Sequence, residues 1–273
     1  MRFSFCMPGA DTILHEDKKS DGYFAHYYEK CSEITQNLGL EVFESNIGTL
    51  KMLSDDDIDY LAKKYAESDL GLYAFNGLLP NMPNIVTATA DETVILHEHI
   101  DQTVLRLEKL GSKILVFGSG GNRRIPEGFD ADTAKNKIYD FIVYTEALCN
   151  KADITLVLEP LNRDETNWCN SVKDGAKIVR ELSLPSFRLL ADGYHMSREK
   201  EDLSVIEENA DILCHCHIAS EQRNIPGSTE YEGRFLSALK KIGYTGTVSV
   251  ECGYSDFFTD APRTLEFMKN AVK

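Results

Sequence analysis

Short apolar runs alternate with longer amphipathic stretches along the chain, and the alternation repeats eight times. Apolar, β-branched-rich runs are typical of strands buried on both faces. Apolar positions spaced three or four residues apart are typical of helices that pack on one side. The predicted strands are 2–6, 40–44, 70–75, 113–117, 155–159, 187–192, 212–218 and 247–251, and the predicted helices are about 22–38, from 54 onward, 91–110, 131–150, 171–185, 199–209, 231–242 and 261–272.

Eight consecutive strand-then-helix units predict one (β/α)8 barrel domain over residues 1–273. A doubly wound parallel sheet is the alternative, but eight units in this length favour closure into a barrel. In such barrels the functional side chains lie at the C-terminal ends of the strands. Polar residues at those ends are therefore the candidates for a site.

Charge and composition narrow the classes of partner. The formal net charge is −15, which argues against nucleic acid, because phosphates need a basic face. The chain has no apolar segment long enough for a membrane span, so we expect no membrane partner. The seven cysteines form neither a disulfide framework nor a zinc motif, which indicates a reduced, cytoplasmic setting.

Four successive predicted strands end in a polar residue that can transfer a proton or bind a metal. The fifth strand ends in Glu159 before Pro160, and the sixth, seventh and eighth end in Asp192, His217 and Glu251. Proline cannot donate to a sheet, so the fifth strand stops there. In a barrel of parallel strands these four side chains would converge at one mouth.

Such a cluster of carboxylates predicts a metal ion. Each carboxylate pair at about 4 Å repels by about 4 kcal/mol at an effective dielectric constant near 20. A shared proton or a divalent cation removes this repulsion. Three carboxylates and one imidazole suit Mn²⁺, Co²⁺ or Mg²⁺ better than structural zinc. We expect one octahedral ion, Mn²⁺ first, with two positions left for substrate oxygens; the alternative is four unrelated residues solvated at the rim.

The C-terminal half also resembles a known family. The segments 159–163 with Glu165, 192–195, 215–217 with Arg223, and 249–251 resemble the sugar isomerase/epimerase superfamily of xylose isomerase-like barrels, and most closely its ketose 3-epimerase branch. The resemblance implies a small sugar substrate and a homo-oligomer, either a dimer or a tetramer. It implies the following roles: metal binding by Glu159, Asp192, His217 and Glu251, proton transfer by Glu159 and Glu251, and substrate binding by Glu165, His195 and Arg223.

The chemistry is consistent with these roles. A proton next to a ketose carbonyl is too weakly acidic for a free carboxylate, and a bound cation stabilises the resulting enediolate. Of Glu159 and Glu251, one would remove the proton and the other would return it from the opposite face. Return to the adjacent carbon gives aldose–ketose isomerisation, so these residues do not separate epimerase from isomerase.

Three other functions remain as alternatives. A lyase of the same fold, inosose dehydratase-like or C-glycoside-cleaving, would enolise a keto-sugar and then eliminate a substituent. A non-catalytic sugar-binding barrel would bind without turnover. An apurinic endonuclease-like barrel is disfavoured, because it needs three zinc ions with many more histidines and a basic groove.

Further residues have two interpretations each. Trp168 would either stack on a sugar ring or pack within its loop. The Gly-rich stretch 118–121 with Arg123 and Arg124 could bind a phosphate, but it lacks the P-loop spacing, and a barrel loop needs glycine for turning anyway.

Three other histidines are expected outside the set of metal ligands. We expect His97 and His99, within a predicted helix, to be solvated or to cap. His215 is expected to be buried one layer below the metal and hydrogen-bonded.

Overall fold

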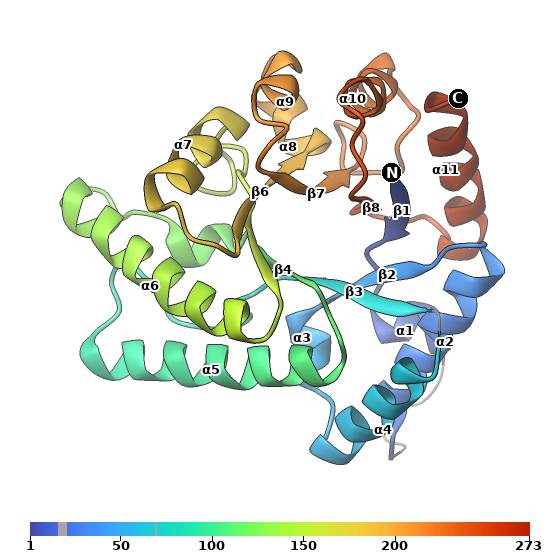
Figure 1. The fold of residues 1–273 in the computed structure, drawn as a ribbon, viewed down its shortest axis with the longest axis horizontal. Helices are drawn as coiled ribbons and strands as arrows, with labels where there is room; N and C mark the ends of the chain where they lie inside the picture. The colour runs from blue at the N-terminus through green and yellow to red at the C-terminus, as the bar shows by residue number, and fades with distance from the viewer. Residues whose placement is uncertain (16–20, 69) are drawn as a thin grey trace.

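In the computed structural model, which describes residues 1–15, 21–68 and 70–273, eight parallel strands form one sheet that curls into a barrel (Figure 1). The sheet order is β1-β8-β7-β6-β5-β4-β3-β2, and a parallel bridge between Cys6 and Glu44 joins the two edges. The predicted (β/α)8 barrel is confirmed. The strands are β1 (Arg2–Phe5), β2 (Val42–Asn46), β3 (Gly71–Asn76), β4 (Ile114–Phe117), β5 (Thr155–Leu158), β6 (Phe187–Asp192), β7 (Leu213–Ile218) and β8 (Thr247–Val250).

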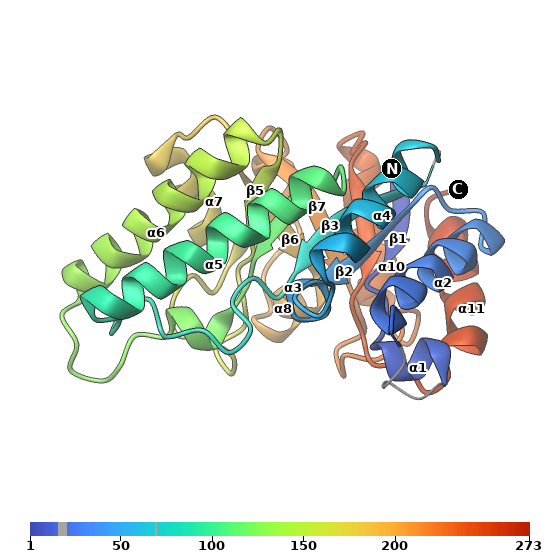
Figure 2. The ribbon, with the colours of Figure 1, turned by 90° about the horizontal axis from the view of Figure 1, so that it is seen from below.

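The long helices cover the outside of the ring of strands (Figure 1). The short helices that follow β1, β2 and β6 lie at the end of the barrel opposite the two chain termini (Figure 2). The helices are α1 (Ala10–Leu14), α2 (Tyr23–Asn37), α3 (Ile47–Leu50), α4 (Asp55–Ala66), α5 (Ala90–Lys109), the 3-10 helix η1 (Gly120–Arg123), α6 (Ala131–Lys151), α7 (Val172–Leu182), α8 (Gly193–Arg198), α9 (Ser204–Glu208), α10 (Glu230–Lys241) and α11 (Phe257–Ala271).

Helix caps explain where the structure agrees with the predicted bounds and where it differs. The predicted capping box of α4 is present: Ser54 and Asp57 each accept a hydrogen bond from the other's backbone N–H. The last helix begins at 257 rather than at the predicted 261, because the Asp256 side chain caps it. Pro262 lies inside this helix. The predicted helix 199–209 is wrong: one short helix follows Asp192 directly and a second covers only 204–208.

The interior of the barrel has an apolar layer below a polar one. Val157 and Leu190 belong to a small buried cluster with residues of β3 and β4. They lie two positions before Glu159 and Asp192, so the period of two places those carboxylates on the same inner side, nearer the C-terminal end. The apolar layer therefore forms the part of the floor below the polar cluster that β3 to β6 provide, while His215, the register partner of Leu190, lies at the same level. The main core cluster lies between the sheet and the surrounding helices.

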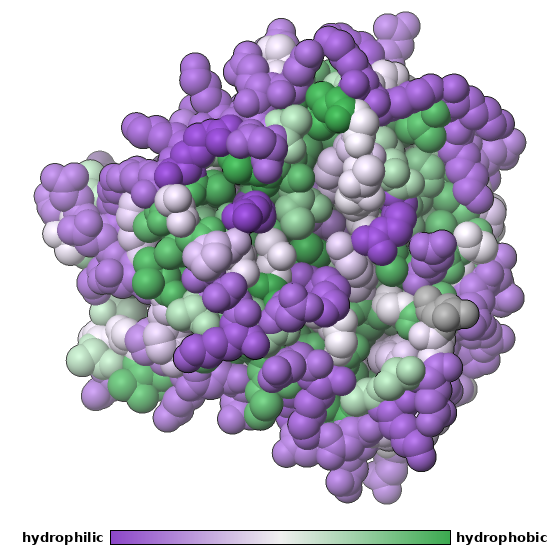
Figure 3. Space-filling view, viewed as in Figure 1, coloured by the Kyte–Doolittle hydropathy of each residue, from purple (hydrophilic) through white to green (hydrophobic). Residues whose placement is uncertain are grey.

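On the face shown in Figure 3, hydrophilic side chains cover most of the rim, while hydrophobic ones show mainly toward the middle. Within the part of the chain that the structure describes, no helix is both long and apolar enough to cross a membrane.

The expectation of a solvated or capping role is wrong for His99. This side chain is buried, and its Nε2 lies 2.7 Å from the carbonyl oxygen of Leu78 in the loop after β3. His97 stacks on Tyr144, with ring centroids 3.7 Å apart. Both imidazoles therefore have contacts within the protein that the helical pattern did not reveal.

Candidate active site

The four predicted strand-end residues meet at one end of the barrel. Asp192 and His217 are register partners across β6 and β7, while Glu159 and Glu251 directly follow β5 and β8. One ligand atom from each of the four lies within 4.8 Å of those of the other three. The structure therefore brings together the side chains that the sequence predicted to converge.

Burial makes this cluster unfavourable without an added positive charge. Glu159, Asp192 and His217 are buried, and Glu251 is partly exposed. Burial raises the pKa of Glu159. Burial, together with the charge of Glu159, raises the pKa of Asp192 to about 8. A divalent cation would supply the missing charge, and carboxylate oxygens with one imidazole nitrogen fit a hard or borderline ion.

The ring of His217 lies between this cluster and a buried carboxylate on the opposite wall, Glu44. Its Nδ1 is 3.0 Å from Glu159 Oε1 and 3.8 Å from Glu251 Oε2. Its Nε2 is 3.0 Å from Glu44 Oε1. Nδ1 is therefore the nitrogen that faces the candidate metal position.

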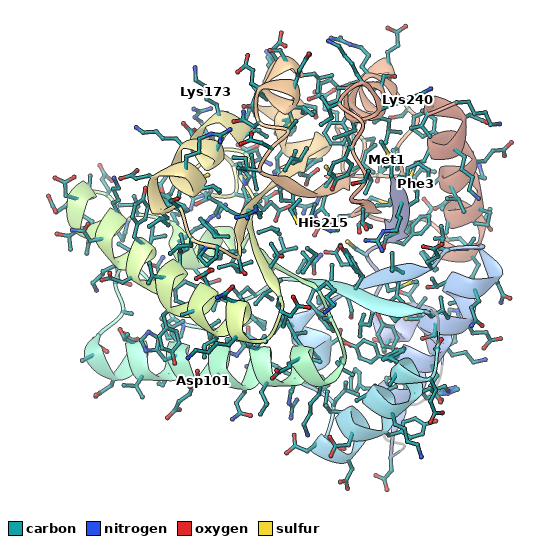
Figure 4. The ribbon with its side chains drawn as sticks, in the orientation of Figure 1. Met1, Phe3, Asp101, Lys173, His215 and Lys240 are labelled. Carbon is teal, nitrogen blue, oxygen red and sulfur yellow. The ribbon has the colours of Figure 1, made fainter. Side chains whose placement is uncertain are left out.

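Glu44 also contacts His215, which lies inside the ring of strands (Figure 4). His215 is fully buried, and its Nε2 is 2.8 Å from Glu44 Oε2, so it lies where the sequence predicted. Burial would raise the pKa of Glu44, but the two imidazoles outweigh burial and hold that pKa well below the usual range. Sequence reasoning missed Glu44, although a lone acidic residue in an apolar strand was a usable sign of it.

Both oxygens of Glu251 accept hydrogen bonds. Arg223 donates to Glu251 Oε2 at 2.9 Å and to Glu165 Oε1 at 2.8 Å. Asn76, at the end of β3, donates to Glu251 Oε1 at 2.8 Å. The structure thus places predicted substrate-binding residues 165 and 223 beside the cluster. It adds Asn76, a residue to which the sequence pattern assigned no role.

His195 presents an unpaired N–H toward the cluster. Its Nδ1 accepts hydrogen bonds from the backbone N–H of Asn162 at 3.1 Å and from Asn162 Nδ2 at 2.8 Å, so the ring proton lies on Nε2. That buried Nε2 has no hydrogen-bond partner among the described residues and is 3.5 Å from Asp192 Oδ2. Burial, reinforced by the charge of Arg223, lowers the pKa of His195 to about 2, so the ring is a neutral donor.

Trp168 packs against the protein. Its ring lies over the guanidinium group of Arg123, 5.3 Å from that carbon to the ring centroid. Arg123 is fully buried and donates to the carbonyl oxygens of Phe117 at 3.1 Å and Glu159 at 2.6 Å. The contact with Arg123 supports the interpretation that Trp168 packs within the protein. A contact between Trp168 and the substrate stays a prediction.

Both arginines of the Gly-rich stretch, for which phosphate binding was one interpretation, contact backbone oxygens. The guanidinium of Arg123 is buried against carbonyl oxygens, and Arg124 donates to the carbonyl oxygen of Asp164 at 3.0 Å. The Gly-rich loop has another use: a Cβ on Gly118 would clash with Glu159 Oε2. Gly118 therefore leaves room for the Glu159 carboxylate.

Replacing Gly118 by alanine is expected to displace the Glu159 carboxylate and weaken Mn²⁺ binding at least about tenfold. The fold should survive, because the clashing atom is the end of a flexible side chain. Titration calorimetry of the metal-free protein with Mn²⁺ measures the effect. Gly121→Ala, in the same loop, is the matched control, since nothing lies within 4 Å of its added Cβ. Equal affinity in the two variants would contradict the prediction.

The comparisons with known proteins agree with the barrel fold. A family profile described as "Xylose isomerase-like TIM barrel" matches residues 33–271. The 3-dehydro-D-guloside 4-epimerase of Escherichia coli is 30% identical over 128 residues, which cover 46% of this chain and 48% of that protein. The D-psicose 3-epimerase of Agrobacterium fabrum is 24% identical over 84% of this chain and 78% of its own. A crystal structure of the E. coli 3-keto-D-glucoside 4-epimerase superimposes with a TM-score of 0.79 at 20% identity over 99% of both chains.

Proposed function

The chain belongs to the xylose isomerase-like TIM barrel family, and we propose that it is a metal-dependent sugar epimerase or isomerase. It would remove and return a proton on a carbon next to a keto-sugar carbonyl. The observation that carries the proposal is the convergence of Glu159, Asp192, His217 and Glu251 within 4.8 Å of one another. The epimerase names of the matched relatives support the same chemistry.

Those four residues would hold one divalent cation, with Mn²⁺ as the expected ion and Co²⁺ or Mg²⁺ as alternatives. When bound, the ion would stabilise the negative charge that develops on substrate oxygens. The buried apolar layer of Val157 and Leu190 lies below the site. Apolar surroundings strengthen electrostatic interactions inside the site.

Glu159 and Glu251 would act as the acid/base pair. One takes the proton from the carbon next to the carbonyl, and the other returns a proton from the opposite face, which inverts that carbon. Arg223 and Asn76 hold the carboxylate of Glu251, and Arg123 holds the backbone of Glu159. The carboxylate of Glu251 and the backbone of Glu159 are thereby fixed in position, and proton transfer requires such positioning.

The neutral ring of His195 would donate its Nε2–H to a substrate oxygen. Asn162 fixes this tautomer by donating twice to Nδ1. Arg223 and Glu165 form an ion pair beside the same space and would bind substrate hydroxyls or the carbonyl. A preorganised neutral donor stabilises a developing oxyanion without reorganisation.

The burial of Arg123 against carbonyl oxygens favours an unphosphorylated substrate. Arg123 and Arg124, the cations of the Gly-rich loop, are both bound to backbone oxygens. The names of the relatives place inversion at C3 of a ketose or C4 of a 3-dehydro sugar, and in each the inverted carbon adjoins the carbonyl carbon. Elimination by a lyase would start from the same enolisation. The matched relatives named above are epimerases, so they do not favour the lyase alternative.

Deuterium exchange in D₂O tests the proposal. The purified protein with Mn²⁺ is incubated with D-psicose, D-tagatose or a 3-keto-D-glucoside, and the products are followed by NMR. We expect deuterium on the carbon next to the carbonyl, together with the epimer, and neither when EDTA is present. Release of water or of an aglycone, or exchange that resists EDTA, would overturn the proposal.

A further inference from the structure

Glu44 connects two strands that are not neighbours in the sheet. β2 and β7 are separated by β1 and β8 in the order of the barrel, so the contacts of Glu44 with His215 and His217 cross the barrel interior. All three side chains are fully buried. The backbone of Glu44 is fixed as well, because its carbonyl oxygen accepts from Met7 N–H at 2.9 Å.

The contacts of Glu44 determine where the ring protons lie. An ionised carboxylate only accepts hydrogen bonds, so each nitrogen that faces it must carry a proton. Both facing nitrogens are Nε2, at 2.8 Å in His215 and 3.0 Å in His217. In a neutral ring of His217 the lone pair is then on Nδ1, which points at Glu159 and Glu251.

We propose that Glu44 is a positioning residue that holds the ring of His217 with Nδ1 directed at the metal ion. The inference rests on the proposed function, since it assigns a role relative to that metal. His215 occupies the second oxygen of Glu44 and so prevents the carboxylate from rotating away from His217. The ring of His215 also packs edge-on against that of His217, with centroids 5.1 Å apart.

Glu44→Gln tests the role with little change in size. The amide keeps one acceptor oxygen and replaces the other by an NH₂ donor, so only one of the two facing N–H groups keeps its acceptor. We expect the Kd for Mn²⁺ to rise about 10–100-fold, the usual effect of losing the partner of a ligating histidine. Titration calorimetry of metal-free protein measures the Kd, and thermal unfolding of the same sample reports stability separately.

Glu146→Gln is the matched control. Glu146 is a buried carboxylate on α6 that accepts from Ser186 N–H at 2.7 Å, away from the site. It should keep the wild-type Kd for Mn²⁺, whatever its effect on thermal unfolding. If Glu44→Gln does not fold, Glu44→Asp keeps the charge but withdraws it by one methylene, and its Kd should rise in the same direction.

The outcomes separate this inference from the proposed function. Weaker Mn²⁺ binding in the Glu44 variant, with unchanged binding in the Glu146 variant, supports it. Wild-type affinity in a folded Glu44 variant overturns it and leaves the proposed function standing. A wild-type protein that binds none of Mn²⁺, Co²⁺ and Mg²⁺ overturns the proposed function itself, and the inference falls with it.

Discussion

Glu159→Gln and Glu251→Gln are each expected to lower kcat for epimerisation by about 10³-fold or more. General acid–base catalysis by one positioned group is worth about 10²–10⁴-fold, and each residue is also an expected metal ligand. Glutamine keeps the size of the side chain but cannot accept or return the proton. Steady-state rates with the substrate identified by deuterium exchange measure the loss.

Deuterium exchange distinguishes loss of one carboxylate from general damage. A variant that retains one functional carboxylate should exchange the proton of one epimer for deuterium on one face of the carbon. The configuration of that carbon should not invert. Glu127→Gln, on an exposed position of the loop after β4, is the control and should keep the wild-type rate. Full activity in either the Glu159 or the Glu251 variant would disprove the two-carboxylate mechanism.

Removing the metal is expected to abolish activity and lower thermal stability. Without a cation, three carboxylates face one another within 4.8 Å, and a pair at about 4 Å repels by about 4 kcal/mol at an effective dielectric constant near 20. Mn²⁺ at a free concentration a hundredfold above its Kd stabilises the folded state by about 2.7 kcal/mol. For a domain of this size that corresponds to a rise in Tm of about 5 °C.

Dialysis against EDTA, followed by scanning calorimetry and rate measurements with and without added Mn²⁺, checks this. Restored activity and the rise in Tm should appear together. In Asp192→Asn, added Mn²⁺ should raise Tm much less, because one of the four expected ligands has lost its charge. A chelated protein that keeps its full rate would refute the requirement for a metal.

The sequence by itself predicted the order of the eight strands and of the long helices between them, and it predicted the residues at the ends of β5 to β8. Both predictions rest on local rules. Parallel strands present their C-terminal ends at one edge, and the period of two fixes which side chains point inward. Glu159, Asp192, His217 and Glu251 could therefore be grouped without knowledge of any distance between them. Ser54 and Asp57 were equally predictable, because a capping box lies within four residues.

Only the tertiary structure decided which residues support that site from across the barrel. Glu44 meets His217 over a separation of 173 residues, and Asn76 meets Glu251 over 175. Closure of the ring creates these contacts, and a lone Glu or Asn in a strand has the same local pattern whether it is solvated or buried. Arg123 shows the same limit: its basic, Gly-rich context is compatible with a phosphate site, yet the fold buries its guanidinium against two carbonyl oxygens. The local sequence determines which side chains of a strand point into the barrel. Their burial and their long-range partners depend on the packing of the whole barrel.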